Sequence, residues 1–181
     1  KFKANYYQAR DGDPSGDIVI DSFVHLSRRK GFEDAWVDAF LSAMEQDLTK
    51  KTYETIQETI DYMYGSAEVI GLMMAKIMSL PKESYVFSRY LGRAMQYINF
   101  IRDIAEDNKL GRIYLPSEEM KHHGLSTLQY EEARSKPKCF TSFIHQQIER
   151  YYRWQEIAEK GYTYIPKRYL KIGRESRTER V

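Results

Sequence analysis

The sequence predicts an all-α protein. Hydrophobic residues recur at helical spacing through most of the 181 residues, as Ile18, Phe23 and Leu26 do near the start. No alternation typical of a β-strand persists beyond a few residues, and neither a fixed-period repeat nor a low-complexity block is present. The expected helices are too long and too apolar to be stable alone, so residues 1–181 should pack as a single helical domain.

The first half of the chain divides into three expected helices. The first covers residues 17–30 and ends at Gly31, and the second covers residues 33–48. Thr52 is expected to N-cap a third, long helix that reaches about residue 80, where a proline follows. The opening "KFKANYYQAR" has the character of a helix interior, and the closing "GRESRTERV" is a charged tail without an apolar face. We therefore expect the chain to be part of a larger protein, or to lack disordered segments.

The second half contains two further long helices. One is expected over residues 82–108, followed by a loop over residues 109–116. Ser126 and Gln129 have the spacing of a capping box for a short helix. The last long helix is expected over residues 138–160, where a glycine ends it.

Composition excludes several classes of function. The net charge of +2 is spread over interspersed acids and bases, which gives no footprint for nucleic acid. Cys139 is the single cysteine, which rules out an internal disulfide and suits a reducing compartment. The most apolar run, residues 69–78, contains Lys76 and is too short to span a membrane. We expect a cytoplasmic protein that contacts membranes at most peripherally; the oligomeric state is not indicated.

A stripe of polar residues runs along the predicted helix 82–108. Gln96, Asn99, Asp103 and Asp107 stand at i, i+3, i+7 and i+11, which places them on one face. This face is either solvated surface or the wall of a polar cavity. No lysine interrupts the stripe, a helix dipole disfavours carboxylates in a last turn, and carboxylates four residues apart repel each other. Mg²⁺ would reverse these penalties, because it prefers hard oxygen ligands completed by water and substrate phosphate.

Cations stand next to this stripe. Lys109 and Arg112 lie in the following loop and have the charge needed to hold a phosphate. Arg102 precedes Asp103 directly and fits either interpretation of the face.

A second unusual stretch is "DYMYGSAEVIG", residues 61–71. Two glycines inside a helix each cost about 1 kcal/mol relative to alanine. Small side chains here either allow close packing of helices or open a groove for a long apolar ligand, with the Tyr62 and Tyr64 hydroxyls at its mouth. The small residues are Gly65, Ser66, Ala67 and Gly71.

The stretches "YMYGSAEVIG" and "LGRAMQYINFIRDIAEDNKLGRIYLP" resemble the squalene/phytoene synthase family of head-to-head prenyl transferases. The resemblance covers about residues 15–172, and "GRIYLP" with the later "KRYL" is most similar to prokaryotic phytoene synthases. It implies an isoprenoid synthase bundle around a central apolar cavity, with two aspartate motifs facing each other across its mouth.

The implied activity is a Mg²⁺-dependent condensation, with Mn²⁺ as an alternative ion. Two molecules of the allylic substrate geranylgeranyl diphosphate would join through a cyclopropyl intermediate to give phytoene for carotenoid biosynthesis. Squalene or dehydrosqualene synthesis from farnesyl diphosphate remains an alternative, and squalene synthesis would need NADPH. The chain could otherwise be a non-catalytic scaffold relative or an unrelated helical interaction module. The insolubility of the hydrocarbon product implies peripheral membrane contact.

The resemblance also implies roles for individual residues. Asp103 and Asp107 match the second aspartate motif and would bind the metal. The expected catalytic residues are Tyr62, Gln96, Asn99 and Arg102. The residues expected to bind the substrate, along the prenyl chain and at the phosphate, are Gly65, Ala67, Ile70, Gly71 and Arg112.

The sequence departs from the family pattern in two places. Relatives commonly have "VAGxVG" where this chain has Ser66 and Glu68, and we expect the Glu68 side chain to point away from the cavity. The first aspartate motif is missing and should lie upstream of residue 1. Asp34 and Asp38 have its spacing, but we interpret them as a solvated helix face. The diphosphate site would then be half built, so residues 1–181 alone should be inactive.

Overall fold

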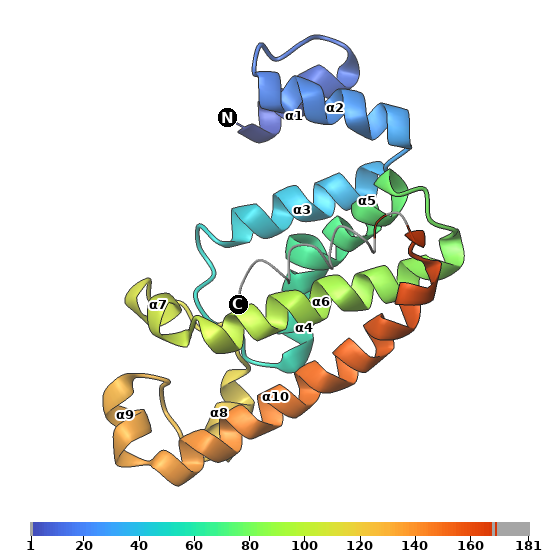
Figure 1. Ribbon diagram of the computed structural model, residues 1–181. Helices are drawn as coiled ribbons and strands as arrows, with labels where there is room; N and C mark the ends of the chain where they lie inside the picture. The colour runs from blue at the N-terminus through green and yellow to red at the C-terminus, as the bar shows by residue number, and fades with distance from the viewer. Residues whose placement is uncertain (1, 168, 170–181) are drawn as a thin grey trace, which may run out of the picture.

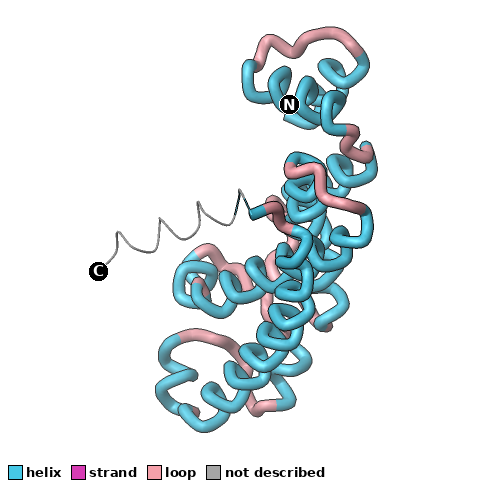
Figure 2. The backbone as a smooth tube through the Cα atoms, turned by 45° about the vertical axis from the view of Figure 1, so that its right-hand side comes forward, coloured by secondary structure: helices cyan, strands magenta, loops and turns pink. Residues whose placement is uncertain are grey.

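The computed structural model describes residues 2–167 and 169, and this part of the chain consists of helices joined by loops, which confirms the all-α prediction (Figure 1). One isolated bridge between Thr52 and Ile113 is the single β-type pairing within it. The tube in Figure 2 shows helices and short loops stacked into an elongated body. None of the helices within these described residues is long and apolar enough to cross a membrane.

The α1–α2 hairpin lies at one end of the molecule (Figure 1). Helix α1 covers Phe2–Asp11, and α2 covers Ile18–Lys30, close to the bounds predicted for the 17–30 helix. The Asp17 carboxylate accepts hydrogen bonds from the first backbone N–H groups of α2, and Gly31 ends the helix with a left-handed φ of 64°. Helix α3, Asp34–Gln46, follows directly and confirms the second expected helix.

The predicted helix 52–80 is divided into three pieces. Helix α4 covers Ile56–Met63, a π-helical segment η1 covers Tyr64–Glu68, and α5 covers Val69–Ile77. The prediction that Thr52 is the N-cap was wrong. Thr55 is the cap, and its hydroxyl accepts from the backbone N–H of Glu58 at 3.2 Å.

The predicted helix 82–108 is also interrupted. After a 3₁₀ turn, Lys82–Ser84, helix α6 covers Tyr85–Arg102, and α7 covers Ile104–Lys109. Asp103 separates them with φ −96° and ψ 17°, in the sparsely allowed region where active-site residues are often found. One continuous helix was therefore the wrong prediction, although Asp107 still donates its N–H to the Asp103 carbonyl.

Short helices and one long helix complete the chain. These are α8 (Ser117–His122), α9 (Tyr130–Ser135), α10 (Pro137–Glu159) and a 3₁₀ segment η3 (Lys160–Tyr164). The capping box predicted for α9 was wrong. The Glu132 carboxylate instead accepts from the backbone N–H groups of Ser126 and Thr127, at 3.0 and 2.6 Å.

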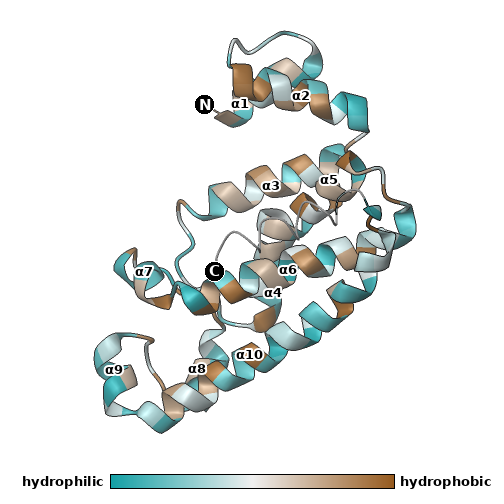
Figure 3. Ribbon diagram, in the orientation of Figure 1, coloured by the Kyte–Doolittle hydropathy of each residue, from teal (hydrophilic) through white to brown (hydrophobic). Residues whose placement is uncertain are grey.

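Helix α6 is the centre of the bundle. It packs against α10, α5 and η1, while α3 covers the other side of η1. Hydrophobic and hydrophilic stretches alternate along the ribbons of α3 and α6 (Figure 3), as expected for helices with one apolar face and one polar face. The core has two clusters: one joins α1, α2, α3 and α5, and the other joins α4, α6 and α10 with the loop that carries Tyr114 and Leu115.

Candidate active site

The four residues of the polar stripe line a single pocket. Gln96, Asn99, Asp103 and Asp107 are all half-buried and face a hollow of about 300 Å³, which we name the polar pocket. The interruption at Asp103 does not turn either carboxylate away. The other residues that line it are Met44, Asp47, Tyr62, Ser66, Phe100 and Tyr114.

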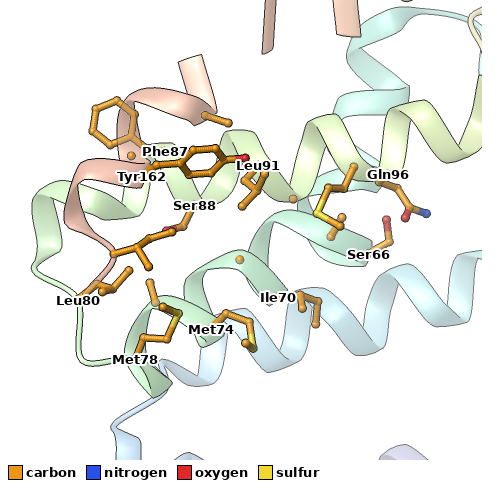
Figure 4. Close-up of a pocket in the computed structure, with 18 of the residues that line it drawn as sticks. Ser66, Ile70, Met74, Met78, Leu80, Phe87, Ser88, Leu91, Gln96 and Tyr162 are labelled. Atoms are coloured by element: carbon orange, nitrogen blue, oxygen red, sulfur yellow. The ribbon is translucent and has the colours of Figure 1, made fainter. Parts of the chain in front are cut away.

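A larger, apolar hollow adjoins the polar pocket. This apolar cavity has a volume of about 480 Å³ and lies between α5, α6 and η3. Figure 4 shows polar Ser66 and Gln96 at one end and Met78 and Leu80 at the other. Ser66, Gln96 and Asn99 line both hollows, so the polar pocket opens onto the apolar cavity.

The two carboxylates differ in their electrostatic surroundings. Asp103 accepts two hydrogen bonds from the Arg102 guanidinium, both 2.6 Å, and these bonds lower the pKa of Asp103. Burial raises the pKa of Asp107, and the negative charge of Asp103 raises it further. Without a cation, Asp107 is therefore an unfavourably placed carboxylate. Arg102 is 67% exposed and lines a separate hollow beside α9 rather than the polar pocket.

The polar pocket suits a hard divalent cation bound together with an anionic ligand. Asp103 and Asp107 supply carboxylate oxygens, and Asn99 and Gln96 add amide oxygens on the same wall. Within the described residues, no group of three or more histidines, cysteines and acids is placed to enclose a metal. Two carboxylates completed by water and phosphate oxygens is the arrangement that Mg²⁺ commonly uses.

Tyr62 belongs to an aromatic cluster of Tyr53, Tyr62, Phe100 and Tyr114 at the base of the polar pocket. The Phe100 and Tyr114 rings stack 4.4 Å apart, and the Tyr62 ring lies 5.4 Å from that of Tyr114. Burial raises the pKa of Tyr62, and the neighbouring groups Tyr114 and Asp47 raise it further. The Tyr62 phenol is therefore neutral throughout the physiological pH range.

Asp47 is a pocket residue that sequence reasoning missed. It follows α3 directly, and its carboxylate accepts hydrogen bonds from the Tyr62 and Tyr114 hydroxyls at 3.0 and 3.1 Å. A carboxylate at the C-terminal end of a helix is disfavoured by the dipole, which is the same signal that singled out the aspartates of the stripe. Its partners lie 15 and 67 residues away along the chain, so spacing alone does not reveal them.

Arg112 lies behind the wall of the polar pocket. Its Nη2 donates to the Asp47 backbone carbonyl at 2.9 Å, and its Nη1 is 3.5 Å from the Tyr114 hydroxyl. Arg112 does not line the polar pocket, so the structure places it as a support for Asp47 and Tyr114.

The small residues of η1 and α5 serve two purposes. A Cβ on Gly65 would lie 2.4 Å from the Ala39 carbonyl oxygen, and one on Gly71 would lie 2.1 Å from that of Ser88. Both glycines therefore allow close packing of helices. Gly65 lies against α3 and does not line the apolar cavity, whereas Ala67, Ile70 and Gly71 do.

Glu68 points away from the apolar cavity, as expected. Its side chain is fully buried, and its oxygens accept from Arg89 Nε at 2.8 Å and Arg93 Nε at 2.6 Å. Both arginines lie on α6, so the ion pairs join η1 to the central helix. The interpretation of Asp34 and Asp38 as a solvated face is also confirmed, since both are exposed and Asp38 accepts from the Tyr7 hydroxyl.

Comparisons with known proteins agree with this geometry. The family model described as squalene/phytoene synthase matches residues 1–174. A chloroplastic phytoene synthase of Daucus carota is 36% identical over 128 residues, which are 67% of this chain and 32% of the relative. A 15-cis-phytoene synthase of Pantoea ananas is 30% identical over 149 residues, which are 80% of this chain and 48% of the relative.

Solved structures share the fold. Squalene synthase HpnC from Alicyclobacillus acidocaldarius superposes with a TM-score of 0.82 at 22% identity, covering 93% of this chain and 64% of that one. A dehydrosqualene synthase superposes with a TM-score of 0.77 at 22% identity, covering 91% and 58%. The fold is therefore that of an isoprenoid synthase, and the chain spans about a third to a half of the length of the curated relatives above. The chain belongs to the squalene/phytoene synthase family.

Proposed function

We propose that the intact protein carrying this chain condenses two molecules of geranylgeranyl diphosphate head-to-head to phytoene. In the first step, C1 of one molecule bonds across the C2–C3 double bond of the other, and one diphosphate and one proton leave. In the second step, the cyclopropyl diphosphate loses its diphosphate, rearranges and loses a second proton. The observation that carries this proposal is the junction at Ser66, Gln96 and Asn99, where the polar pocket opens onto the apolar cavity.

The polar pocket would hold the diphosphate end of the substrate. Asp103 and Asp107 would bind Mg²⁺, which neutralises the charge of the leaving diphosphate. Asn99 and Gln96 extend the same wall toward the apolar cavity and would orient the allylic carbons. Arg102 holds Asp103 through two hydrogen bonds and so fixes the orientation of that carboxylate.

The apolar cavity would hold the prenyl chain and exclude water from the carbocation. Ala67, Ile70 and Gly71 lie along its wall, which Met74, Met78 and Leu91 extend. The aromatic cluster at the base of the polar pocket presents ring faces and phenol oxygens beside the position where positive charge develops. A second wall, with the first aspartate motif, would come from a segment upstream of residue 1.

The names of relatives support the C20 substrate. The sequence relatives described above are phytoene synthases, at 30% to 36% identity. The two solved structures are described as a squalene and a dehydrosqualene synthase, so farnesyl diphosphate, with NADPH for squalene, is the second candidate. A scaffold role is disfavoured because both carboxylates and both amides of the polar stripe line the polar pocket.

Product analysis tests this function directly. The intact protein is incubated with geranylgeranyl or farnesyl diphosphate, with and without NADPH, in Mg²⁺ or in excess chelator, and hydrocarbons are identified by mass. A C40 product without NADPH that disappears with chelator is expected. If the protein forms a C30 product from farnesyl diphosphate and no product from geranylgeranyl diphosphate, the second candidate function is correct. If no hydrocarbon forms under any condition, the scaffold role is favoured.

A further inference from the structure

The carboxylate of Asp47 is engaged on the floor of the polar pocket. The Tyr62 hydroxyl lies 3.0 Å from both Asp47 oxygens, and the Tyr114 hydroxyl lies 3.1 Å from Oδ1. In each of these contacts the phenol hydroxyl is the donor and the carboxylate oxygen is the acceptor. Arg112 holds the same residue from behind through the Asp47 backbone carbonyl, at 2.9 Å. Asp47 is therefore fixed from three sides.

This arrangement separates Asp47 from the two aspartates of the stripe. All three carboxylates line the polar pocket, but they do not form a cluster that encloses a metal within the described residues. The Asp47 oxygens accept hydrogen bonds from two buried phenols, whereas the Asp103 oxygens accept theirs from the Arg102 side chain, which is 67% exposed and lies outside the polar pocket. A role for Asp47 through Tyr62 fits these contacts better than a role as a metal ligand.

The direction of the hydrogen bond determines what Tyr62 offers to a bound molecule. A phenol hydroxyl has one proton, and Tyr62 donates it in a hydrogen bond to Asp47. The Tyr62 oxygen keeps its lone pairs as acceptors, and the residue lines the polar pocket beside Tyr114. Tyr62 is only 3% exposed, so its ring cannot swing away and carry the hydroxyl to a distant partner. A hydroxyl dipole held with its oxygen toward the pocket stabilises positive charge that develops there.

We propose that Asp47 is a positioning residue that holds the Tyr62 hydroxyl as a donor to itself and so presents the Tyr62 oxygen to the reacting cation. This inference rests on the proposed function and adds a residue to it. It also assigns Tyr62 the part of an acceptor facing the cation, rather than that of a donor to the leaving diphosphate. The Tyr114 hydroxyl donates a further hydrogen bond to the same carboxylate, and the Tyr114 ring stacks on the rings of Tyr53 and Tyr62.

A double-mutant cycle in the intact protein tests the proposal. The variants are Asp47→Asn, Tyr62→Phe and their combination, each assayed for kcat, KM and melting temperature with geranylgeranyl diphosphate and Mg²⁺. Tyr7→Phe is the matched control, since it removes a phenol hydrogen bond of 2.8 Å to the exposed carboxylate of Asp38, and neither residue lines the polar pocket. Asp47→Asn should lower kcat about 10- to 100-fold with KM nearly unchanged, as supporting residues around a site do.

The combination decides between positioning and a general structural effect. If Asp47 acts through Tyr62, the double variant should be no slower than the slower single variant, and Tyr7→Phe should leave kcat unchanged. Losses that multiply in the double variant, or a loss that appears in KM alone, would overturn the inference. Should Asp47→Asn fail to fold, Asp47→Glu replaces it in the cycle with the same expectations. A wild type that makes no hydrocarbon would overturn the proposed function itself, which keeps the two failures distinct.

Discussion

Glu68 offers the most quantitative test of how the site is supported. Its carboxylate is fully buried between Arg89, whose side chain is 43% exposed, and Arg93, whose side chain is 14% exposed. Removing one partner of a buried ion pair costs about 3–5 kcal/mol, because the other charge is left uncompensated. Water can reach Arg89, so the lower end of this range applies. We therefore expect Glu68→Gln to reduce the free energy of unfolding by about 3 kcal/mol.

Thermal unfolding followed by circular dichroism measures this loss. A change of 1 kcal/mol shifts the melting temperature by about 2–4 °C in chains of 150–250 residues, so the expected drop is about 6–12 °C. The matched control is Glu45→Gln. Glu45 makes a single ion pair with Lys3 at 3.0 Å, but their side chains are 65% and 45% exposed, so its loss should cost less than about 1 kcal/mol.

The two arginines should also differ from each other. Arg93→Met should cost nearly as much as Glu68→Gln because it leaves the buried carboxylate with one exposed partner, while Arg89→Met should cost much less. If the loss of unfolding free energy for Glu68→Gln is within about 1 kcal/mol of that for the Glu45→Gln control, Glu68 does not anchor η1 to α6.

Three further predictions follow from the site and its packing. Asp103→Asn or Asp107→Asn should abolish Mg²⁺-dependent product formation while circular dichroism stays unchanged, and product formation at the wild-type rate would refute the metal assignment. Because the pKa of Asp107 is raised in the folded protein, stability from this group falls as pH rises from 3.8 through that pKa. Metal-free Asp107→Asn should thus be more stable than wild type to urea at pH 7, with the advantage shrinking toward pH 4; an equal or lower midpoint at pH 7 would contradict this. Gly71→Ala places a Cβ about 2.1 Å from the Ser88 carbonyl oxygen and should destabilise by about 1–3 kcal/mol, measured by chemical denaturation; an unchanged midpoint would show that α5 and α6 can move apart.

Capping residues in the sequence predicted the helix ends that depend only on neighbouring residues. The ends of α2 follow from Asp17 and Gly31, which cap it as their side-chain types predict. Thr52 and Thr55 are equally good caps in sequence, and the choice of Thr55 depends on the pairing of Thr52 with Ile113 from a distant loop. The π-helical segment η1 and the break at Asp103 likewise have no signal in residue spacing.

The candidate site was predictable in part for the same reason. The polar stripe needs only helical periodicity, and its four residues do line one pocket. Arg112 and Asp47 depend on tertiary contacts: the first supports the pocket from behind, and the second receives phenols from two other segments. Gly65 was expected in the cavity wall, but it faces α3, and this contact depends on how the helices pack rather than on residue spacing.

The most direct test of the central claim compares wild type with Asp107→Asn. Both intact proteins are given geranylgeranyl diphosphate and Mg²⁺ without NADPH, and the hydrocarbon fraction is analysed by mass. A C40 hydrocarbon from wild type and none from the variant is the predicted result, because the polar pocket must neutralise the leaving diphosphate. Equal amounts of C40 hydrocarbon from both proteins would contradict the assignment of the polar pocket as the site of diphosphate ionisation.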